Sequence, residues 1–386
     1  MTPKTNATLP PFITDAERSV RLENLRNLMT DGGPQAIILT PGSNLQYFFG
    51  LKLFESERFI GAIITQTETV FICPNFEDAS LAAKLKRPYE TLYWEEDEDP
   101  YAIIASHLSA KSVSQCAIDP NCSYGHASRI GNALGGAIGI GSADAQIAPL
   151  RSRKSTSELA LMTCAKQLTL AVHLTISRWI KPGMASTEVK HEIDRLHRAA
   201  GADNGSSFCA VQFGEATAYP HGVPGDPVLQ PGELILIDTG CQIDGYNSDI
   251  TRTYALDTMS EEIETMWALE KEAQQAAFDR AGPGVLCEEV DAAARDVLVK
   301  RGLGPEYKLP GLPHRTGHGI GLDIHEGPYL VRGDKTVLAE GMCFSNEPMI
   351  VVPGKFGIRL EDHFYIAERG AAWFTDPQQS LYSLMQ

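Results

Sequence analysis

Five acidic and imidazole side chains stand where an apolar strand or a tight loop should carry no free charge. Asp238 ends the apolar run 234–237, Asp249 begins the strand-like run 250–254, and His318 lies in a glycine-rich stretch. Glu347 and Glu361 lie on two short apolar stretches nearer the C-terminus. Four ionised carboxylates would balance two divalent cations, and the imidazole adds a neutral nitrogen ligand. The set therefore predicts a two-metal site, with ions ~3.5–4 Å apart, that activates a water as hydroxide and polarises a carbonyl.

The two aspartates are predicted to share one face of a hairpin. Asp244-Gly245 is a strong signal for a two-residue turn between two apolar runs. That turn places Gly240 opposite Asp249, so Asp249 and Asp238 point to the same side of the ribbon. Two like charges roughly 4 Å apart repel by about 4 kcal/mol at an effective dielectric constant of about 20. Either a positive group lies between them, or both are solvated loop aspartates.

Two further segments place polar side chains among apolar or glycine-rich sequence. The stretch HRTGHGIGLDIHEGP, residues 314–328, contains His314, His318 and His325. Its glycines would let the backbone approach a ligand closely, although histidines with purely structural partners are the alternative. In FGIRLEDHFYI, residues 356–366, the polar residues alternate with apolar ones and define a second face. Such a face is either solvent-exposed or lines a cavity.

Composition excludes several classes of partner. The chain has 386 residues, 43% of them hydrophobic, which suits two or three domains. A net charge of −16 and a pI near 5.1 argue against nucleic-acid or anionic-membrane partners. We expect no signal peptide and no membrane span, because no apolar run approaches the required length. Eight scattered cysteines without a CxxC motif favour reduced thiols in the cytoplasm.

The elements that must position these residues divide the chain near residue 150. Residues 1–150 alternate helical and strand patterns and predict a small α/β domain, with a helix from the capping box at Thr14 to about residue 29 and strands at 36–40, 59–65 and 69–73. A second capping box, Ser155 with Glu158, opens a helix to about residue 179. Further helices are predicted at 186–201, 260–280 and 288–301. The second half is therefore α+β, with helix pairs covering one curved antiparallel sheet.

The motifs together resemble a known enzyme family. The order Asp, Asp, His, Glu, Glu occurs in the contexts IDTG, DGYNSDITRT, GHGIGLDIHEGP, NEP and GIRLED. It is similar to the pita-bread metallopeptidases, in particular the proline-specific branch that includes prolidase (Xaa-Pro dipeptidase), Xaa-Pro aminopeptidase and creatinase-like proteins. The match runs from about residue 150 to 370. The resemblance implies a creatinase/prolidase-like N-terminal domain, residues 1–150, and a pita-bread catalytic domain, residues 151–386.

The resemblance also assigns roles to the charged residues. Asp238, Asp249, His318, Glu347 and Glu361 match the five metal ligands of the family. Among these, Asp249 and Glu361 match the bridging carboxylates. Glu347 matches the group that takes the proton from the nucleophilic water.

Four more residues match positions around the substrate. His221, in YPHGVPGDP, matches a histidine near the scissile amide, and His325 matches the second histidine. His314 matches a substrate-pocket histidine, and Arg359 an arginine of the proline-specific branch. One departure is Val351, which stands where members of this branch often have tyrosine in E-P-G-x-Y. That difference bears on details of catalysis and rate more than on reaction class.

The expected activity is hydrolysis of the Xaa-Pro bond of dipeptides by two divalent ions, with Mn²⁺ implied by the resemblance and Zn²⁺ or Co²⁺ as alternatives. The resemblance also implies a homodimer in which the partner's N-terminal domain helps to close the substrate pit. An Xaa-Pro aminopeptidase acting on longer peptides is the nearest alternative. A lyase, a phosphotriesterase or a non-catalytic binding protein could use the same fold. Creatinase itself is disfavoured, because it lacks this metal set.

Overall fold

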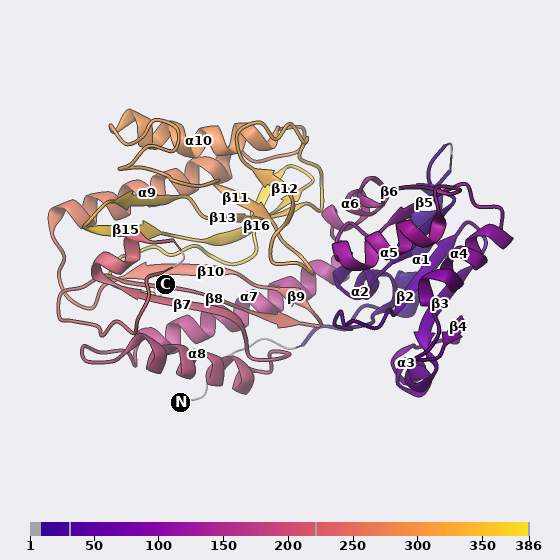
Figure 1. Ribbon diagram of the computed structural model, residues 1–386. Helices are drawn as coiled ribbons and strands as arrows, with labels where there is room; N and C mark the ends of the chain where they lie inside the picture. The colour runs from indigo at the N-terminus through magenta and orange to yellow at the C-terminus, as the bar shows by residue number, and fades with distance from the viewer. Residues whose placement is uncertain (1–8, 31, 221, 385–386) are drawn as a thin grey trace. The chain divides into compact units, whose positions relative to one another are not determined.

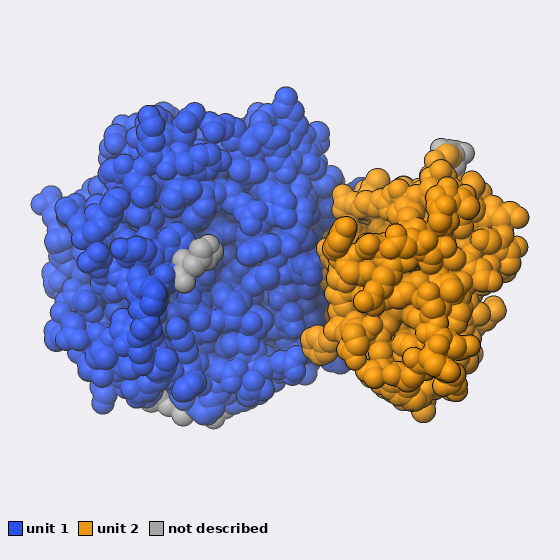
Figure 2. Space-filling view, in the orientation of Figure 1, with its two compact units in different colours: residues 1–12, 152–386 blue, residues 13–151 orange. Residues whose placement is uncertain are grey.

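The computed structural model describes residues 9–30, 32–220 and 222–384, which fall into two compact units. Residues 13–151 form one unit, and the described parts of 1–12 and 152–386 form the other (Figure 2). Each unit has its own sheet and its own clusters of buried apolar side chains.

The unit of residues 13–151 is an α/β domain, as the sequence predicts. Its six-stranded mixed sheet has the order β4-β3-β2-β1-β5-β6, with fully buried β1 parallel to β5 and antiparallel to β2. The strands are β1 (Ala36–Leu39), β2 (Gly61–Thr65), β3 (Thr69–Pro74), β4 (Glu90–Trp94), β5 (Gln115–Ile118) and β6 (Gly139–Ser142). The helices are α1 (Asp15–Asn27), α2 (Ser43–Phe49), α3 (Asp78–Lys84), α4 (Pro100–Ala110), α5 (Tyr124–Leu134) and α6 (Asp144–Ser152).

The second unit contains two helix pairs with strands between them (Figure 1). The first pair is α7 (Thr156–Ser177) with α8 (Ser186–Ala200), and the second is α9 (Glu261–Arg280) with α10 (Cys287–Lys300). The predicted capping box begins α7, with Glu158 N donating to Ser155 Oγ at 3.2 Å and Ser155 N donating to Glu158 Oε2 at 2.9 Å. Helix α7 is long and apolar enough to cross a bilayer, but 56% of its apolar window is buried in the protein. A core helix of a globular protein can have the same length, composition and burial.

The strands of this unit are all antiparallel and form three sheets. One has the order β10-β8-β7 with the short β9 beside β8, the next has the order β12-β11-β13-β16-β17, and the third is the hairpin β14-β15. The strands are β7 (Ser206–Phe213), β8 (Ile235–Ile243), β9 (Tyr246–Asn247), β10 (Ile250–Tyr254), β11 (Gly317–Gly319), β12 (Glu326–Leu330), β13 (Cys343–Asn346), β14 (Met349–Val352), β15 (Phe356–Arg359), β16 (Asp362–Ala367) and β17 (Gly370–Trp373). The predicted antiparallel sheet is thus present, but its ladder is interrupted after Asn346 and again after Arg359.

The predicted hairpin has the expected register. Asp244 and Gly245 both have positive φ, 51° and 84°, which suits a two-residue turn that follows the twist of the strands. Asp238 pairs with Thr251 across β8 and β10, so Asp238 and Asp249 lie diagonally on one face. A Cβ atom on Gly240 would lie 1.9 Å from the backbone oxygen of Ser248, so only glycine fits there.

Candidate metal centre

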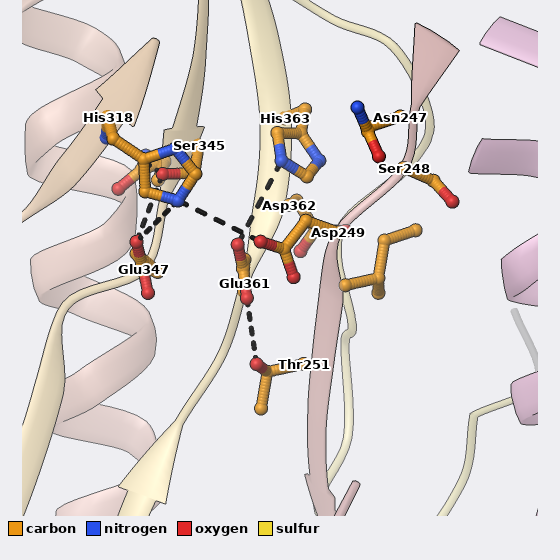
Figure 3. Close-up of polar contacts among 12 residues, drawn as sticks. Asn247, Ser248, Asp249, Thr251, His318, Ser345, Glu347, Glu361, Asp362 and His363 are labelled. Carbon is orange, nitrogen blue, oxygen red and sulfur yellow. Dashed lines mark hydrogen bonds and ion pairs between the residues drawn. The ribbon is translucent and has the colours of Figure 1, made fainter. Parts of the chain in front are cut away.

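The five predicted ligands lie on, or next to, strands of the second unit. Asp238 lies within β8, Asp249 directly precedes β10 and His318 is the middle residue of β11. Glu347 lies between β13 and β14, and Glu361 lies between β15 and β16. The residues placed in Figure 3 therefore converge from segments more than 100 positions apart in the chain, from Asp249 to Glu361.

The ligand atoms are close enough to share cations. His318 Nε2 lies 3.1 Å from Glu347 Oε1 and 3.8 Å from Asp249 Oδ2 (Figure 3). Among the described residues, three overlapping groups have ligand atoms within 4.8 Å of one another. They are Asp249 with His318 and His325, His318 with Glu347 and Glu361, and Asp238 with Asp249 and Glu361. All five predicted ligands occur in these groups.

Unpartnered buried oxygens provide the test of whether these residues fit metal ions. Among the described residues, Asp238 Oδ1, Asp249 Oδ1 and Glu361 Oε1 have no hydrogen-bond partner although they are buried. Glu361 is 1% exposed and Asp249 5% exposed. A buried carboxylate without a partner is strongly unfavourable unless it neutralises or coordinates a cation. The donor set and its unpartnered oxygens therefore fit divalent ions.

The electrostatics point the same way. Burial, followed by the nearby charge of Glu361, raises the pKa of Asp249 well above its usual range. Burial and the charge of Glu347 likewise raise the pKa of Glu361. For Glu347 itself burial favours a higher pKa, but the hydrogen bond and charge of His318 outweigh it and the pKa is lowered. Crowded like charges of this kind attract cations.

Arg359 contacts the ligand set directly. Its NH2 group donates to Asp238 Oδ2 at 2.5 Å, and its Nε donates to Thr251 Oγ1 at 3.0 Å. Burial acts to lower the pKa of Arg359, but the carboxylates, Asp238 first, raise it overall. The guanidinium thus holds one predicted ligand in place.

The predicted substrate histidines lie around the same cluster where the structure describes them. The ring of His325 packs edge-on against His318, with centroids 4.2 Å apart, on the more exposed side of the site. His314 Nδ1 lies 2.7 Å from the Arg315 carbonyl, while its buried Nε2 has no partner among described residues. Burial lowers the pKa of both imidazoles, to about 4 for His325. His221 lies outside the described residues.

The glycines near His318 have a physical role in addition to the one expected. A Cβ atom on Gly317 would lie 2.1 Å from Ser345 O, and one on Gly319 would lie 2.5 Å from Glu326 O. These glycines therefore let β11 approach the neighbouring strands closely. Their close approach to a ligand stays a prediction.

Sequence reasoning missed two side chains that orient the ligands, and it placed a third neighbour of the site, His363, on the polar face without giving it a role. Thr251 Oγ1 donates to Glu361 Oε2 at 2.8 Å, and Ser345 Oγ donates to Glu347 Oε1 at 3.1 Å (Figure 3). Fully buried His363 has its Nε2 3.9 Å from Glu361 Oε1. Strand alternation could have found Thr251, which is two residues from Asp249, and did place His363 on the polar face. Ser345 stands two residues before Glu347, so the same alternation could have found it.

Comparison with known proteins places these residues in an enzyme family. Residues 160–368 match "Metallopeptidase family M24", and residues 21–153 match "Creatinase/Prolidase N-terminal domain". The chain is 31% identical over 369 residues to "Putative dipeptidase YkvY" of Bacillus subtilis, covering 94% of this chain and 99% of the relative. It is 32% identical over 370 residues to "Xaa-Pro dipeptidase" of Lactobacillus helveticus, covering 94% and 98%. The solved structure of dipeptidase PepE from Mycobacterium ulcerans superposes with a TM-score of 0.86 at 32% identity, covering 95% of this chain and 97% of that one. The protein therefore belongs to metallopeptidase family M24, with a creatinase/prolidase-type N-terminal domain.

Proposed function

We propose that this protein is a dipeptidase that hydrolyses the Xaa-Pro bond of dipeptides at a site holding two divalent cations. The observation that carries the proposal is the cluster of five ligand side chains with three unpartnered, buried carboxylate oxygens. Family membership supports peptide hydrolysis, and a relative named for Xaa-Pro dipeptides supports the substrate.

Asp238, Asp249, His318, Glu347 and Glu361 would hold the ions, with Asp249 and Glu361 shared between them. When bound, the ions would supply Lewis acidity and lower the pKa of a water held between them. Mn²⁺ is the proposed cation, since four of the five ligands offer oxygen atoms, and oxygen-rich sets suit Mn²⁺.

The remaining steps depend on side chains of this chain. The Glu347 carboxylate accepts the proton of the attacking water and passes it to the departing proline nitrogen. His221 and His325 would contact the reacting amide, and His314 would contact the substrate in its pocket. Arg359, through its ion pair with Asp238, positions that ligand, and binding of the substrate carboxylate is its alternative role.

An Xaa-Pro aminopeptidase acting on longer peptides remains the second candidate, because the same catalytic groups would serve both reactions. Val351 is buried in β14, at 4% exposure. Because valine has no hydroxyl group, this position cannot donate a hydrogen bond to a substrate. The dipeptidase is preferred because the relatives reported above are named as dipeptidases. The match to this chain covers nearly the full length of each relative.

We also propose a cytoplasmic homodimer. All eight cysteines are free, which suits a reducing compartment. On the unit of residues 13–151, Phe54 is 94% exposed and Tyr124 is 87% exposed. Large aromatic side chains this exposed are enriched at protein interfaces.

A substrate panel tests the proposal. Metal-stripped protein is supplied with Mn²⁺, Co²⁺ or Zn²⁺ and offered Ala-Pro, Leu-Pro, Ala-Pro-Yaa tripeptides and Ala-Ala. We expect the two Xaa-Pro dipeptides to be cleaved fastest, with Mn²⁺ giving the highest rate. Equal cleavage of Ala-Pro and Ala-Ala would exclude proline specificity, and faster cleavage of the tripeptides would favour the aminopeptidase.

A further inference from the structure

The backbone leaves its regular sheet at both predicted glutamate ligands. Strand β13 ends at Asn346, which pairs with Asp362 at the start of β16. The hairpin β14-β15 begins at Met349, which pairs with Arg359. Glu347 and Glu361 lie in the gap between these two ladders, where the strands no longer pair with each other. This break frees both carboxylates to turn toward the cluster.

Where a ladder breaks, the backbone carbonyls at its edge need other partners; Asn346 is the last residue of β13, and Leu360 lies just beyond β15. The carbonyls of Asn346 and Leu360 directly precede the two ligands and are buried. Buried backbone acceptors are nearly always paired, so another group must supply donors at this point.

Gln274 supplies them from helix α9. Its Nε2 has two protons and donates to Leu360 O at 3.0 Å, while Asp362 Oδ2 at 3.1 Å and Asn346 O at 3.3 Å share the second proton. The backbone oxygen of Gln274 in turn accepts from Asn346 Nδ2 at 2.8 Å. Gln274 is 1% exposed and has no contact with the ligand atoms themselves in these bonds. One side chain therefore joins the segments immediately before both ligands.

A buried ion pair strengthens the same arrangement. Arg252 NH2 donates to Asp362 Oδ1 at 2.6 Å, and Arg252 NH1 donates to Glu361 O at 2.8 Å. Asp362 is thus held by Arg252 on one oxygen and by Gln274 on the other. A neutral amide suits the remaining position, because the charge of Asp362 already has its counterion.

We propose that Gln274 is a positioning residue for the metal centre, one that fixes the distance between Glu347 and Glu361 through the backbone carbonyls that precede them. The inference rests on the proposed function to the extent that these two glutamates are taken as ligands. Groups that orient metal ligands from behind typically change metal affinity or activity by roughly 10–100-fold when removed.

Gln274→Met provides the test, because methionine has similar length and burial but no N–H group. The matched control is Gln275→Met, since Gln275 is exposed on the same helix and bonds only to Asp279 within the described residues. For each metal-stripped protein, titration calorimetry with Mn²⁺ gives the Kd values, and thermal unfolding without metal gives the Tm. Steady-state hydrolysis of Ala-Pro gives kcat and KM.

For Gln274→Met we expect Mn²⁺ binding weakened by about 10–100-fold for at least one ion and kcat reduced by a similar factor. We expect KM within about twofold and the control unchanged. If the Gln274→Met variant does not fold, as judged by circular dichroism, Gln274→Asn is used instead. The asparagine side chain is too short for its amide to reach both carbonyls.

A lowered metal-free Tm with Mn²⁺ affinity unchanged would overturn the inference and leave a role in stability alone. Calorimetry separates this failure from failure of the proposed function. If wild-type protein binds Mn²⁺ but does not cleave Ala-Pro, the substrate proposal fails and the metal-affinity comparison still decides the role of Gln274. Wild-type protein that binds no Mn²⁺, Co²⁺ or Zn²⁺ would overturn both.

Discussion

At the scale of single residues, the chemistry of the site follows from crowding carboxylates in a buried place. Burial and mutual repulsion raise the pKa of Asp249 and Glu361, whereas His318 lowers that of Glu347. Glu347 therefore differs from its neighbours in being held ionised by a specific partner. A lowered pKa weakens a carboxylate as a base, so the proposed role of Glu347 as proton acceptor rests on its place in the ligand cluster.

Replacing Glu347 by glutamine should lower turnover on Ala-Pro by about 10²–10⁴-fold, because the amide keeps one oxygen ligand but loses the basic site. Metal analysis by mass spectrometry should still find at least one ion per chain, and circular dichroism should show an intact fold. A metal-replete variant within tenfold of wild type would move the proton acceptor elsewhere, with His221 or His325 as the next candidates.

Replacing Asp249 by asparagine should reduce both metal content and activity. Asp249 is proposed to bridge the two ions, and it occurs in two of the three ligand groups among the described residues, so its loss should weaken the binding of both ions. The measurement is the metal-to-protein ratio after dialysis against trace Mn²⁺, compared with the exposed-site control Asp279→Asn. A variant that keeps two ions per chain would count against a bridging role for Asp249.

At the scale of elements, side chains between helices and strands keep the ligand-bearing sheet in place. His197 of α8 is fully buried, with Nε2 3.1 Å from Thr169 Oγ1 of α7 and Nδ1 2.9 Å from Ser206 Oγ of β7. Burial lowers the pKa of His197 to about 4, although the charge of Asp194 acts in the opposite direction. One neutral imidazole thus joins three elements.

This imidazole should make the protein sensitive to acid. In the unfolded chain the histidine binds its proton near pH 6.5, whereas the folded protein resists protonation until about pH 4. Stability should therefore fall as the pH is lowered from about 6.5 to 4, by roughly 3 kcal/mol at most from this residue. Urea unfolding of His197→Gln should show a shallower loss over that range, whereas the exposed-site variant His191→Gln should match wild type. Identical pH slopes for His197→Gln and wild type would contradict this.

At the scale of the whole molecule, two units with separate cores carry different tasks. All five predicted ligands lie in the unit that contains residues 152–386, and none lies in the unit of residues 13–151. The unit of residues 13–151 presents exposed Phe54 and Tyr124, in keeping with its proposed role in assembly.

Sedimentation velocity at micromolar concentration should show a species of about twice the 42.0 kDa chain mass. Phe54→Ser should shift the distribution toward the monomer, because it removes an aromatic side chain that is already exposed and so leaves each core intact. The control is Phe12→Ser, an aromatic position on the other unit that is 56% exposed. A single monomeric species for the wild-type protein would refute the dimer.

Local sequence was sufficient for features that depend on neighbouring residues. The capping box at Ser155, the Asp244-Gly245 turn and the shared face of Asp238 and Asp249 all follow from short-range hydrogen bonding and strand alternation. The five proposed ligands could also be identified from the sequence, because charged side chains are unusual in apolar strands. Tertiary structure alone decided how these segments meet. It divided the expected curved sheet into three sheets and paired Arg359 with Asp238 across 121 positions. It also brought Gln274 to backbone carbonyls 72 and 86 positions away. Such contacts carry no periodic signal in the sequence, since they depend on which helix packs behind which break in the sheet.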